Sequence, residues 1–178
     1  MYYISIYMTE TNINNRLIQK IYMVADHAGF ELLQELHQAL VDQNHIQTNQ
    51  ENQSKKVFLN LSPKLETSDN YPEVIKSLHA TIQNNTENSH NHFMCIAICG
   101  SGQGVCMALN RYPELRAGIG YDLESAKSMR EHNDANCICL SSSHLNLEQA
   151  LEIVNLFLKT ETSKEARHIQ RVKMLSSM

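Results

Sequence analysis

The sequence lacks any apolar run near the length of about 20 residues that a membrane-spanning helix needs. Its opening stretch, MYYISIYM, has no basic lead and continues into the polar residues TETNINN, so it does not resemble a signal peptide. These two absences argue against a membrane protein and against an exported one. We therefore expect a cytoplasmic protein that does not bind a membrane.

An excess of positive charge is also missing. The 15 Lys and Arg residues are outnumbered by 19 Asp and Glu residues, and the formal net charge is −4. Domains that bind nucleic acid usually carry a basic surface, so the charge gives no reason to expect a nucleic-acid partner.

The cysteine pattern of a disulfide scaffold or a zinc site is absent as well. The cysteines number five, and an odd count in a chain without an export signal predicts free thiols. Cys137 and Cys139 are two residues apart in an apolar run, so they face the same side of a strand. That spacing fits a buried face better than a tetrahedral metal site, and we expect no metal there.

What the sequence does contain is a regular alternation of short apolar runs and helical patterns. With 178 residues, 42% of them hydrophobic, the chain can bury a substantial core. We predict an irregular leader over 1–20 and a single domain over 21–178, with Asn/Gln-rich inserts near 43–56 and 83–92. Strands are predicted at 22–25, 57–61, 93–98, 116–121 and 136–141, and helices at 30–43, from 70, and at 105–110, 123–132, 147–158 and 163–178. This alternation indicates βαβ units and an α/β fold with a parallel sheet covered on both faces.

Ligands of such sheets bind beyond the carboxyl ends of the strands. Three polar stretches follow predicted strands: Asp26 and His27, the run from Cys99 to Gly104, and Ser141 to Ser143. These stretches are therefore the first candidates for a functional site.

Three alternating glycines, Gly100, Gly102 and Gly104, form a G-x-G-x-G turn after the third predicted strand. Glycines allow successive backbone amides to point into one concavity, and such amides hold an anion or a developing oxyanion. The turn is not a dinucleotide fingerprint, because position 105 is valine, and it lacks the lysine of a P-loop. A plain strand-to-helix turn explains these glycines equally well.

Cys99 ends the strand before this turn and precedes the next helix. A helix N-terminus favours the thiolate form of a cysteine. A thiolate beside amides that hold an oxyanion can abstract a proton next to a carbonyl group, or it can act as a nucleophile. The loop alone does not decide between these two chemistries.

Several stretches together resemble one known family. They are ADHAGFELLQEL (25–36), NYP (70–72), ICGSGQGVCMALNRYPELRA (98–117), REHNDAN (130–136) and ARHIQRV (166–172). In this order they are similar to type B ribose-5-phosphate isomerase and the related galactose-6-phosphate isomerase subunits. The resemblance implies a Rossmann-like three-layer α/β/α sandwich with a five-stranded parallel sheet. It also implies a homodimer or tetramer with shared active sites, in which the C-terminal helix packs on a partner subunit.

The resemblance further implies a role for each matching residue in converting ribose 5-phosphate to ribulose 5-phosphate, a reaction without a metal or nucleotide cofactor. Cys99 would move the proton between C1 and C2, and Ser101 would assist that step. The amides of Gly100, Gly102 and Gly104 would hold the enediolate. His132 would open the sugar ring, Asp26 and Asn133 would bind hydroxyls, Tyr71 would wall the pocket, and His27, Arg167 and Arg171 would bind the phosphate.

Independent arguments support two of these roles. A histidine relays protons near neutral pH, and Arg167 and Arg171 lie four residues apart on one helix face, where they suit a phosphate. Alone, His132 also fits a helix-end histidine, and the arginines fit a solvated face. We predict surface or loop positions for His168, His144 and the histidines at 90 and 92.

The sequence departs from the family at the edge of the expected site. Ser143 stands where the family has an arginine, Asn60 and Ser62 replace the usual acid and glycine, and Asn70 replaces an acid. These changes affect substrate identity more than reaction type, so a hexose 6-phosphate isomerase remains an alternative. A non-catalytic sugar-phosphate-binding protein is a second one. A thiol-redox protein is the weakest, because Cys99 and Cys106 lack C-x-x-C spacing.

Overall fold

The computed structural model describes residues 18–47, 55–62, 64–65, 70–85 and 93–178. Five strands form one parallel sheet in the order β2-β1-β3-β5-β4. The strands are β1 (Ile18–Ala25), β2 (Lys55–Asn60), β3 (Phe93–Cys99), β4 (Ala117–Ile119) and β5 (Cys137–Ser141). The helices are α1 (Phe30–Gln47), α2 (Tyr71–Asn85), α3 (Gln103–Leu109), α4 (Leu123–Asn133), α5 (Leu147–Lys159) and α6 (Ala166–Leu175). The predicted three-layer α/β fold is confirmed.

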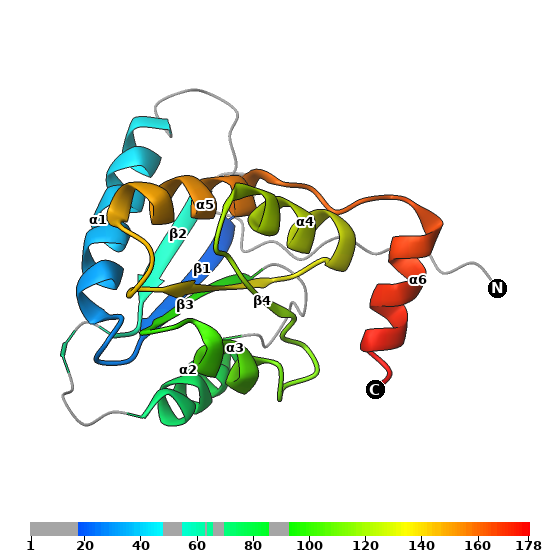
Figure 1. The fold of residues 1–178 in the computed structure, drawn as a ribbon, viewed down its shortest axis with the longest axis horizontal. Coiled ribbons are helices and arrows are strands. Elements are labelled where there is room, and N and C mark those ends of the chain that lie inside the picture. Colours follow the sequence, from blue (N-terminus) through cyan, green and yellow to red (C-terminus); the bar gives the residue numbers. More distant parts are fainter. Residues whose placement is uncertain (1–17, 48–54, 63, 66–69, 86–92) are drawn as a thin grey trace.

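Helices cover both faces of the sheet: α1, α4 and α5 lie on one face, and α2 and α3 on the other (Figure 1). Strand β3 shows why two cores form. Its residues Met94, Ile96 and Ile98 belong to the core under α1, α4 and α5. The alternate residues, from Cys95 to Cys99, belong to the core under α2 and α3, because side chains of a strand point to opposite faces in turn.

Side-chain caps define where two of the helices begin. Asp122 accepts a hydrogen bond from the Ser125 amide before α4, and Asn146 accepts one from the Gln149 amide before α5. In both cases the third helical side chain bonds back to the cap residue, which completes a capping box. These caps fix the path of the chain on either side of β5.

Several element boundaries differ from the sequence prediction. Strand β1 begins at Ile18, inside the expected leader 1–20, because its first residues pair with β2 from Lys55 onward. The expected insert 43–56 contributes the end of α1 and the start of β2, where the Asn44 side chain donates to the Lys56 carbonyl at 2.8 Å. Helix α2 likewise runs to Asn85. Residues 1–17 and most of both inserts lie outside the described residues, and the single domain over 21–178 stays a prediction.

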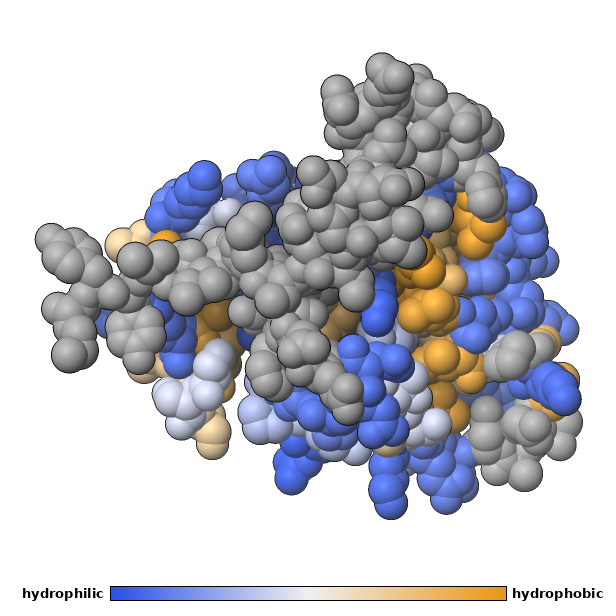
Figure 2. Space-filling view, turned by 180° about the vertical axis from the view of Figure 1, so that it is seen from behind, coloured by the Kyte–Doolittle hydropathy of each residue, from blue (hydrophilic) through white to orange (hydrophobic). Residues whose placement is uncertain are grey.

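Helix α6 lies apart from the sheet, beside the end of α4 (Figure 1). Only His168 of this helix is buried, and its apolar residues Ile169, Met174 and Leu175 are exposed. The predicted packing of α6 on a partner subunit stays a prediction. Seen from behind, the described surface is mostly hydrophilic, with hydrophobic residues showing toward the middle (Figure 2). Among the described helices, none combines the length and the apolar character needed to cross a membrane.

Candidate active site

Three turns meet at the carboxyl edge of the sheet, and the first follows β1. The carboxylate of Asp26 is buried, and its Oδ1 accepts hydrogen bonds from the amides of Ala28 and Gly29 at 3.0 and 3.1 Å. The Asp26 amide donates to the carbonyl of Ile98, which joins this turn to the end of β3. His27 is exposed at the tip of the turn. Asp26 therefore shapes the turn that presents His27.

The second turn carries the predicted base. Cys99 ends β3 and is 4% exposed, and its Sγ accepts a hydrogen bond from the Gly102 amide at 3.2 Å. Gly102 has a φ of 75°, and a Cβ there would approach the carbonyl of Leu140 to 3.2 Å. A residue other than glycine would be strained in this conformation. Ser101 is exposed beside it, and its hydroxyl accepts from the Gln103 amide at 3.3 Å.

The third turn follows β5 and holds the glycine loop in place. The Ser141 hydroxyl donates to the Gly100 carbonyl at 2.7 Å, and the Ser143 amide donates to the same oxygen at 3.0 Å. The Ser142 amide donates to the Cys99 carbonyl at 3.0 Å. Its hydroxyl lies 2.8 Å from the Ala28 carbonyl, so this turn contacts both of the others.

These contacts set the direction of the loop amides. In a planar trans peptide the carbonyl and the following N–H point in opposite directions. The carbonyls of Cys99 and Gly100 point at the turn of residues 141–143, which we call the serine turn, so the amides of Gly100 and Ser101 point away from it. The loop therefore presents backbone donors beside the Cys99 thiol. The sequence identified these serines only by position and by the missing arginine at Ser143, not as supports of the loop.

Tyr71 reaches the glycine loop from the start of α2. Its ring lies so close to Gly104 that a Cβ there would be 2.9 Å from two ring atoms. Tyr71 is 39% exposed and lines a cavity of about 300 Å³ together with Met107 and Tyr112. Tyr71 therefore lies against the glycine loop at this edge, and its role as a wall of the substrate pocket stays a prediction.

The remaining predicted site residues lie at the other edge of the sheet. His132 and Asn133 end α4, just before β5 begins at Cys137, whereas Cys99 is paired with Ser141 at the end of that strand. The four residue steps of β5 from Cys137 to Ser141 separate the two edges by about 13 Å, at about 3.3 Å per step. Arg167 and Arg171 are exposed on α6, beside the end of α4 (Figure 1). One chain thus carries two groups of predicted residues, which we call the thiol half-site (Asp26, His27, Tyr71 and 99–104) and the histidine half-site (His132, Asn133, Arg167 and Arg171).

Two arginines brace the turn behind the histidine half-site. Asp134 follows Asn133 with a φ of 47° and pairs with Arg116 at 2.8 Å and with Arg130 at 2.9 Å. Arg130 is buried, also donates to the Ala135 carbonyl at 2.7 Å, and lies over the Phe157 ring. This network holds the end of α4, and no pattern in the sequence had pointed to it.

His132 is exposed, and its ring stacks on that of His168, with centroids 4.5 Å apart and planes at 9°. The predicted surface position of His168 is wrong, because this stack buries it. No local pattern gave this signal, because Leu175, which shares a helix face with His168, is exposed. His144 is exposed as predicted, and the histidines at 90 and 92 lie outside the described residues.

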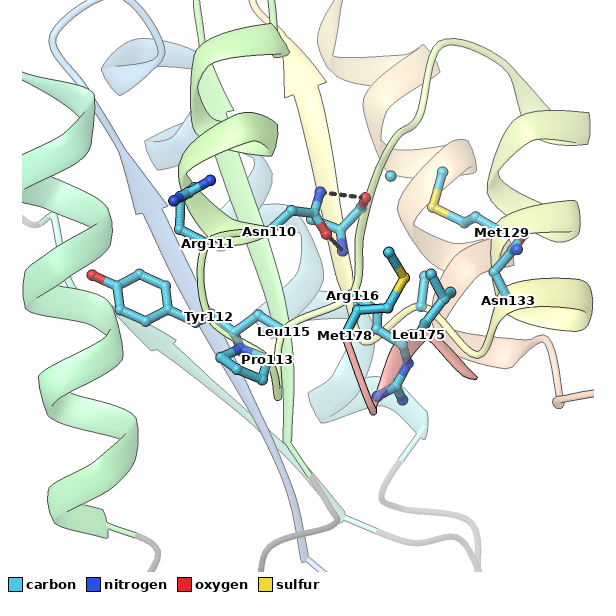
Figure 3. A pocket seen from close by; sticks show the side chains of 13 residues that line it. Asn110, Arg111, Tyr112, Pro113, Leu115, Arg116, Met129, Asn133, Leu175 and Met178 are labelled. Atoms are coloured by element: carbon cyan, nitrogen blue, oxygen red, sulfur yellow. Dashed lines mark hydrogen bonds between the residues drawn. The ribbon is translucent and has the colours of Figure 1, made fainter. Parts of the chain in front are cut away.

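A separate cavity of about 650 Å³ lies between residues 110–118, the end of α4 and the end of α6 (Figure 3). Leu175 and Met178 line it from the C-terminal segment, together with Leu115 and Arg116. Of the predicted site residues only Asn133 lines it. The cavity therefore borders the histidine half-site and does not include the thiol half-site.

All five cysteines are free, as predicted. Burial raises the pKa of Cys95 and of Cys139, so these thiols remain protonated inside the core under α2 and α3. A hydrogen bond with Cys139 lowers the pKa of the half-buried Cys106. Among the described residues no cluster of three or more His, Cys, Asp or Glu side chains could hold a metal ion.

Comparisons with known proteins agree on one family. The model of the Ribose/Galactose Isomerase family matches residues 21–175. A probable ribose-5-phosphate isomerase B of Mycoplasma pneumoniae is 35% identical over 153 residues, which cover 85% of this chain and 90% of the relative. The ribose-5-phosphate isomerase B of Mycobacterium tuberculosis is 28% identical over 158 residues, 88% of each chain.

Solved structures show the same similarity. A ribose 5-phosphate isomerase from Thermotoga maritima superposes with a TM-score of 0.75 at 28% identity, over 90% of this chain and 99% of the other. Ribose-5-phosphate isomerase B from Mycoplasma genitalium, solved with bound ribulose-5-phosphate, has a TM-score of 0.71 at 27% identity, over 92% and 97% of the chains. The chain therefore belongs to the ribose/galactose isomerase family of enzymes.

Proposed function

We propose that this protein interconverts ribose 5-phosphate and ribulose 5-phosphate through an enediolate. The observation that carries the proposal is the thiol half-site, in which the Cys99 sulfur lies 3.2 Å from the Gly102 nitrogen beside amides turned away from the serine turn. A base next to preorganised N–H donors suits proton abstraction beside a carbonyl group. The bound ribulose-5-phosphate of the Mycoplasma genitalium relative supports this choice of substrate.

The steps assign one task to each group. His132 passes a proton to the ring oxygen, the bond from this oxygen to C1 breaks, and the C1 hydroxyl loses its proton to solvent, which opens the furanose of ribose 5-phosphate. The Cys99 thiolate takes the proton from C2, and the amides of the loop bind the enediolate oxygen at C1. The hydroxyl proton moves from O2 to O1, and the thiol returns its proton to C1. Ser101 lies beside the loop and assists this transfer. Asp26 and Asn133 bind sugar hydroxyls.

The phosphate is bound at the far end of the sugar. His27 comes from the thiol half-site, whereas Arg167 and Arg171 come from the histidine half-site. Both arginines are exposed, and Arg167 pairs with Glu165 at 2.7 Å. A phosphate that replaces this carboxylate would form charge-assisted hydrogen bonds with the guanidinium group.

We propose that a complete site combines the thiol half-site of one copy with the histidine half-site of another. The separation of about 13 Å along β5 supports this arrangement, because a sugar phosphate cannot contact Cys99 and His132 of the same chain across the sheet. In a two-fold dimer each copy would supply both half-sites, and two equal active sites would form.

The test is the conversion of ribose 5-phosphate by the purified protein and by Cys99→Ala. We expect turnover by the wild type and a loss of about a hundredfold to ten-thousandfold in the variant, because the base of the proton transfer is gone. Ser177→Ala, an exposed change at the C-terminus, is the matched control and should keep full activity. Turnover of hexose 6-phosphates alone would favour the alternative substrate, and no turnover of any sugar phosphate would favour a binding protein.

A further inference from the structure

His168 is a buried titratable residue that the proposed reaction does not use. It is 6% exposed, whereas the side chain of its neighbour Arg167 is 66% exposed. The ring of His132 stacks on the His168 ring, with the ring centroids 4.5 Å apart and the ring planes at 9°. His168 is therefore in direct ring contact with the residue that would open the sugar.

The stack joins two helices whose relative position matters for the histidine half-site. His132 lies in the last turn of α4, and α6 carries Arg167 and Arg171 on a face next to His168. The segment before α6 is also attached to the end of α4. The Ser163 amide donates to the Glu131 carbonyl at 2.9 Å, and the Thr162 hydroxyl donates to Asp134 at 2.9 Å.

His168 itself has a defined position. Its amide donates to the Glu165 carbonyl at 3.0 Å, and its Nε2 lies 3.7 Å from Oε2 of the same residue. The helix fixes the backbone of His168, and its buried ring has little room to rotate, so the ring can act as a platform. An exposed histidine in the last turn of a helix would otherwise rotate about both side-chain torsions.

We propose that His168 is a positioning residue for His132: its ring fixes the plane of the His132 imidazole and aligns it with the phosphate-binding face of α6. The inference rests on the proposed function, in which His132 delivers a proton to the ring oxygen. That proton transfer requires the imidazole nitrogen within hydrogen-bond reach and correctly oriented. The proton transfer between C1 and C2 belongs to Cys99 and does not depend on this ring.

Two substrates separate these steps. Ribose 5-phosphate is mostly a closed furanose and must be opened, whereas ribulose 5-phosphate is acyclic because its O5 carries the phosphate. In D₂O, exchange of a C1 hydrogen of ribulose 5-phosphate requires only abstraction by the base and return of a deuteron. This exchange therefore reports on the thiol half-site and on phosphate binding, and it does not require ring opening.

The experiment compares His168→Leu, which fills the space without a planar face, with His168→Phe, which keeps an aromatic ring. For His168→Leu we expect kcat with ribose 5-phosphate to fall about tenfold to a hundredfold, since small misplacements of a catalytic group cost this much. Deuterium exchange into ribulose 5-phosphate should stay within about twofold of wild type, and the KM of both sugars should change little. His168→Phe should restore ribose 5-phosphate turnover to within about threefold, because ring planarity is retained.

Three results would overturn the inference. Equal losses in both assays would assign His168 to phosphate binding or to folding, and unchanged kinetics in His168→Leu would remove any role. A His168→Phe variant as slow as His168→Leu would show that a ring nitrogen is required instead of the stacked plane. Gln170→Ala, an exposed polar change on the same helix, is the matched control and should leave both assays unchanged.

A second readout keeps this inference separate from the proposed function. The proton resonances of the His132 ring are shifted by an aromatic ring stacked on it, whether or not the protein turns over a sugar. We expect His168→Leu to abolish this ring-current shift and His168→Phe to keep it. A wild type without turnover or exchange would refute the proposed function, and His132 resonances unchanged in His168→Leu would refute the positioning role.

Discussion

Gly29→Ala should destabilise the protein through a clash with the backbone beside the thiol half-site. A Cβ at position 29 would lie 2.5 Å from the carbonyl oxygen of Ile98 and 2.7 Å from its carbon. Real Cβ atoms essentially never approach closer than 3.0 Å, and the neighbour here is the backbone of a central strand. The turn after β1 must therefore move away from β3.

The cost follows from what holds the turn there. The Gly29 amide donates to Oδ1 of Asp26 and to its backbone carbonyl. The Asp26 amide donates to the Ile98 carbonyl oxygen, which is the atom that the new Cβ would contact. Forced overpacking costs about 1–3 kcal/mol, and weakening one of these hydrogen bonds adds about 1 kcal/mol. The sum of about 2–4 kcal/mol lowers the Tm of a domain of this size by about 4–16 °C.

The assay is thermal unfolding followed by circular dichroism, with Gly100→Ala as the matched control. A Cβ at Gly100 would meet its nearest neighbours at 3.7 and 3.8 Å, which is ordinary van der Waals contact. We expect the control to melt within about 2 °C of wild type, since a change without a clash or a lost bond has little effect. A Gly29→Ala variant as stable as wild type, or a control equally destabilised, would refute the reasoning.

Further predictions concern the supports of each half-site and one surface pair. Ser141→Ala removes the 2.7 Å bond to the Gly100 carbonyl, so kcat should fall roughly tenfold with little change in KM, and an unchanged kcat would contradict the role of the serine turn. Asp134→Ala leaves the buried Arg130 without its carboxylate and should cost about 2–3 kcal/mol in urea unfolding. Glu131 forms an exposed ion pair with Lys127 at 4.0 Å, so Glu131→Ala should lower the free energy of unfolding by less than about 0.5 kcal/mol. Burial alone would raise the pKa of Glu114, but its hydrogen bonds lower it below 4.5, so Glu114→Gln should be less stable than wild type at pH 7. That difference in stability should disappear as the pH falls below 4.5, through the lowered pKa of folded Glu114. A carboxyl group whose pKa is lowered by folding stabilises the protein only while it is ionised.

The strand and helix order was predictable because the apolar runs are short and bounded by polar turns. Buried strands such as 93–99 read as continuous apolar stretches, and α2 shows its buried face as Ile75, Leu78 and Ile82 at helical spacing. The start of β1 was not predictable in this way. Ile18 to Lys20 mix polar and apolar residues, and they become a strand only through pairing with β2.

The residues of the candidate site were predictable one by one, but their grouping was not. Cys99 and Asp26 follow strands, so the topology of a parallel sheet brings them to one edge. His132 lies in the last turn of a helix, which places it at the opposite edge. Only the family resemblance, and no local pattern, implied that active sites are shared between subunits. The braces of Asp134 and the stack of His168 depend on long-range contacts, which local patterns do not encode.

Complementation between two inactive variants tests the shared active site most directly. Cys99→Ala disables the thiol half-site, and His132→Phe disables the histidine half-site while keeping a ring against His168. In a mixed dimer of the two variants one site joins both defects and the other joins both intact half-sites. Random mixing by joint refolding should therefore restore about a quarter of wild-type turnover of ribose 5-phosphate, since half of the dimers are mixed and each has one intact site. A mixture that forms mixed dimers and stays as inactive as its parents would contradict a site shared between two copies.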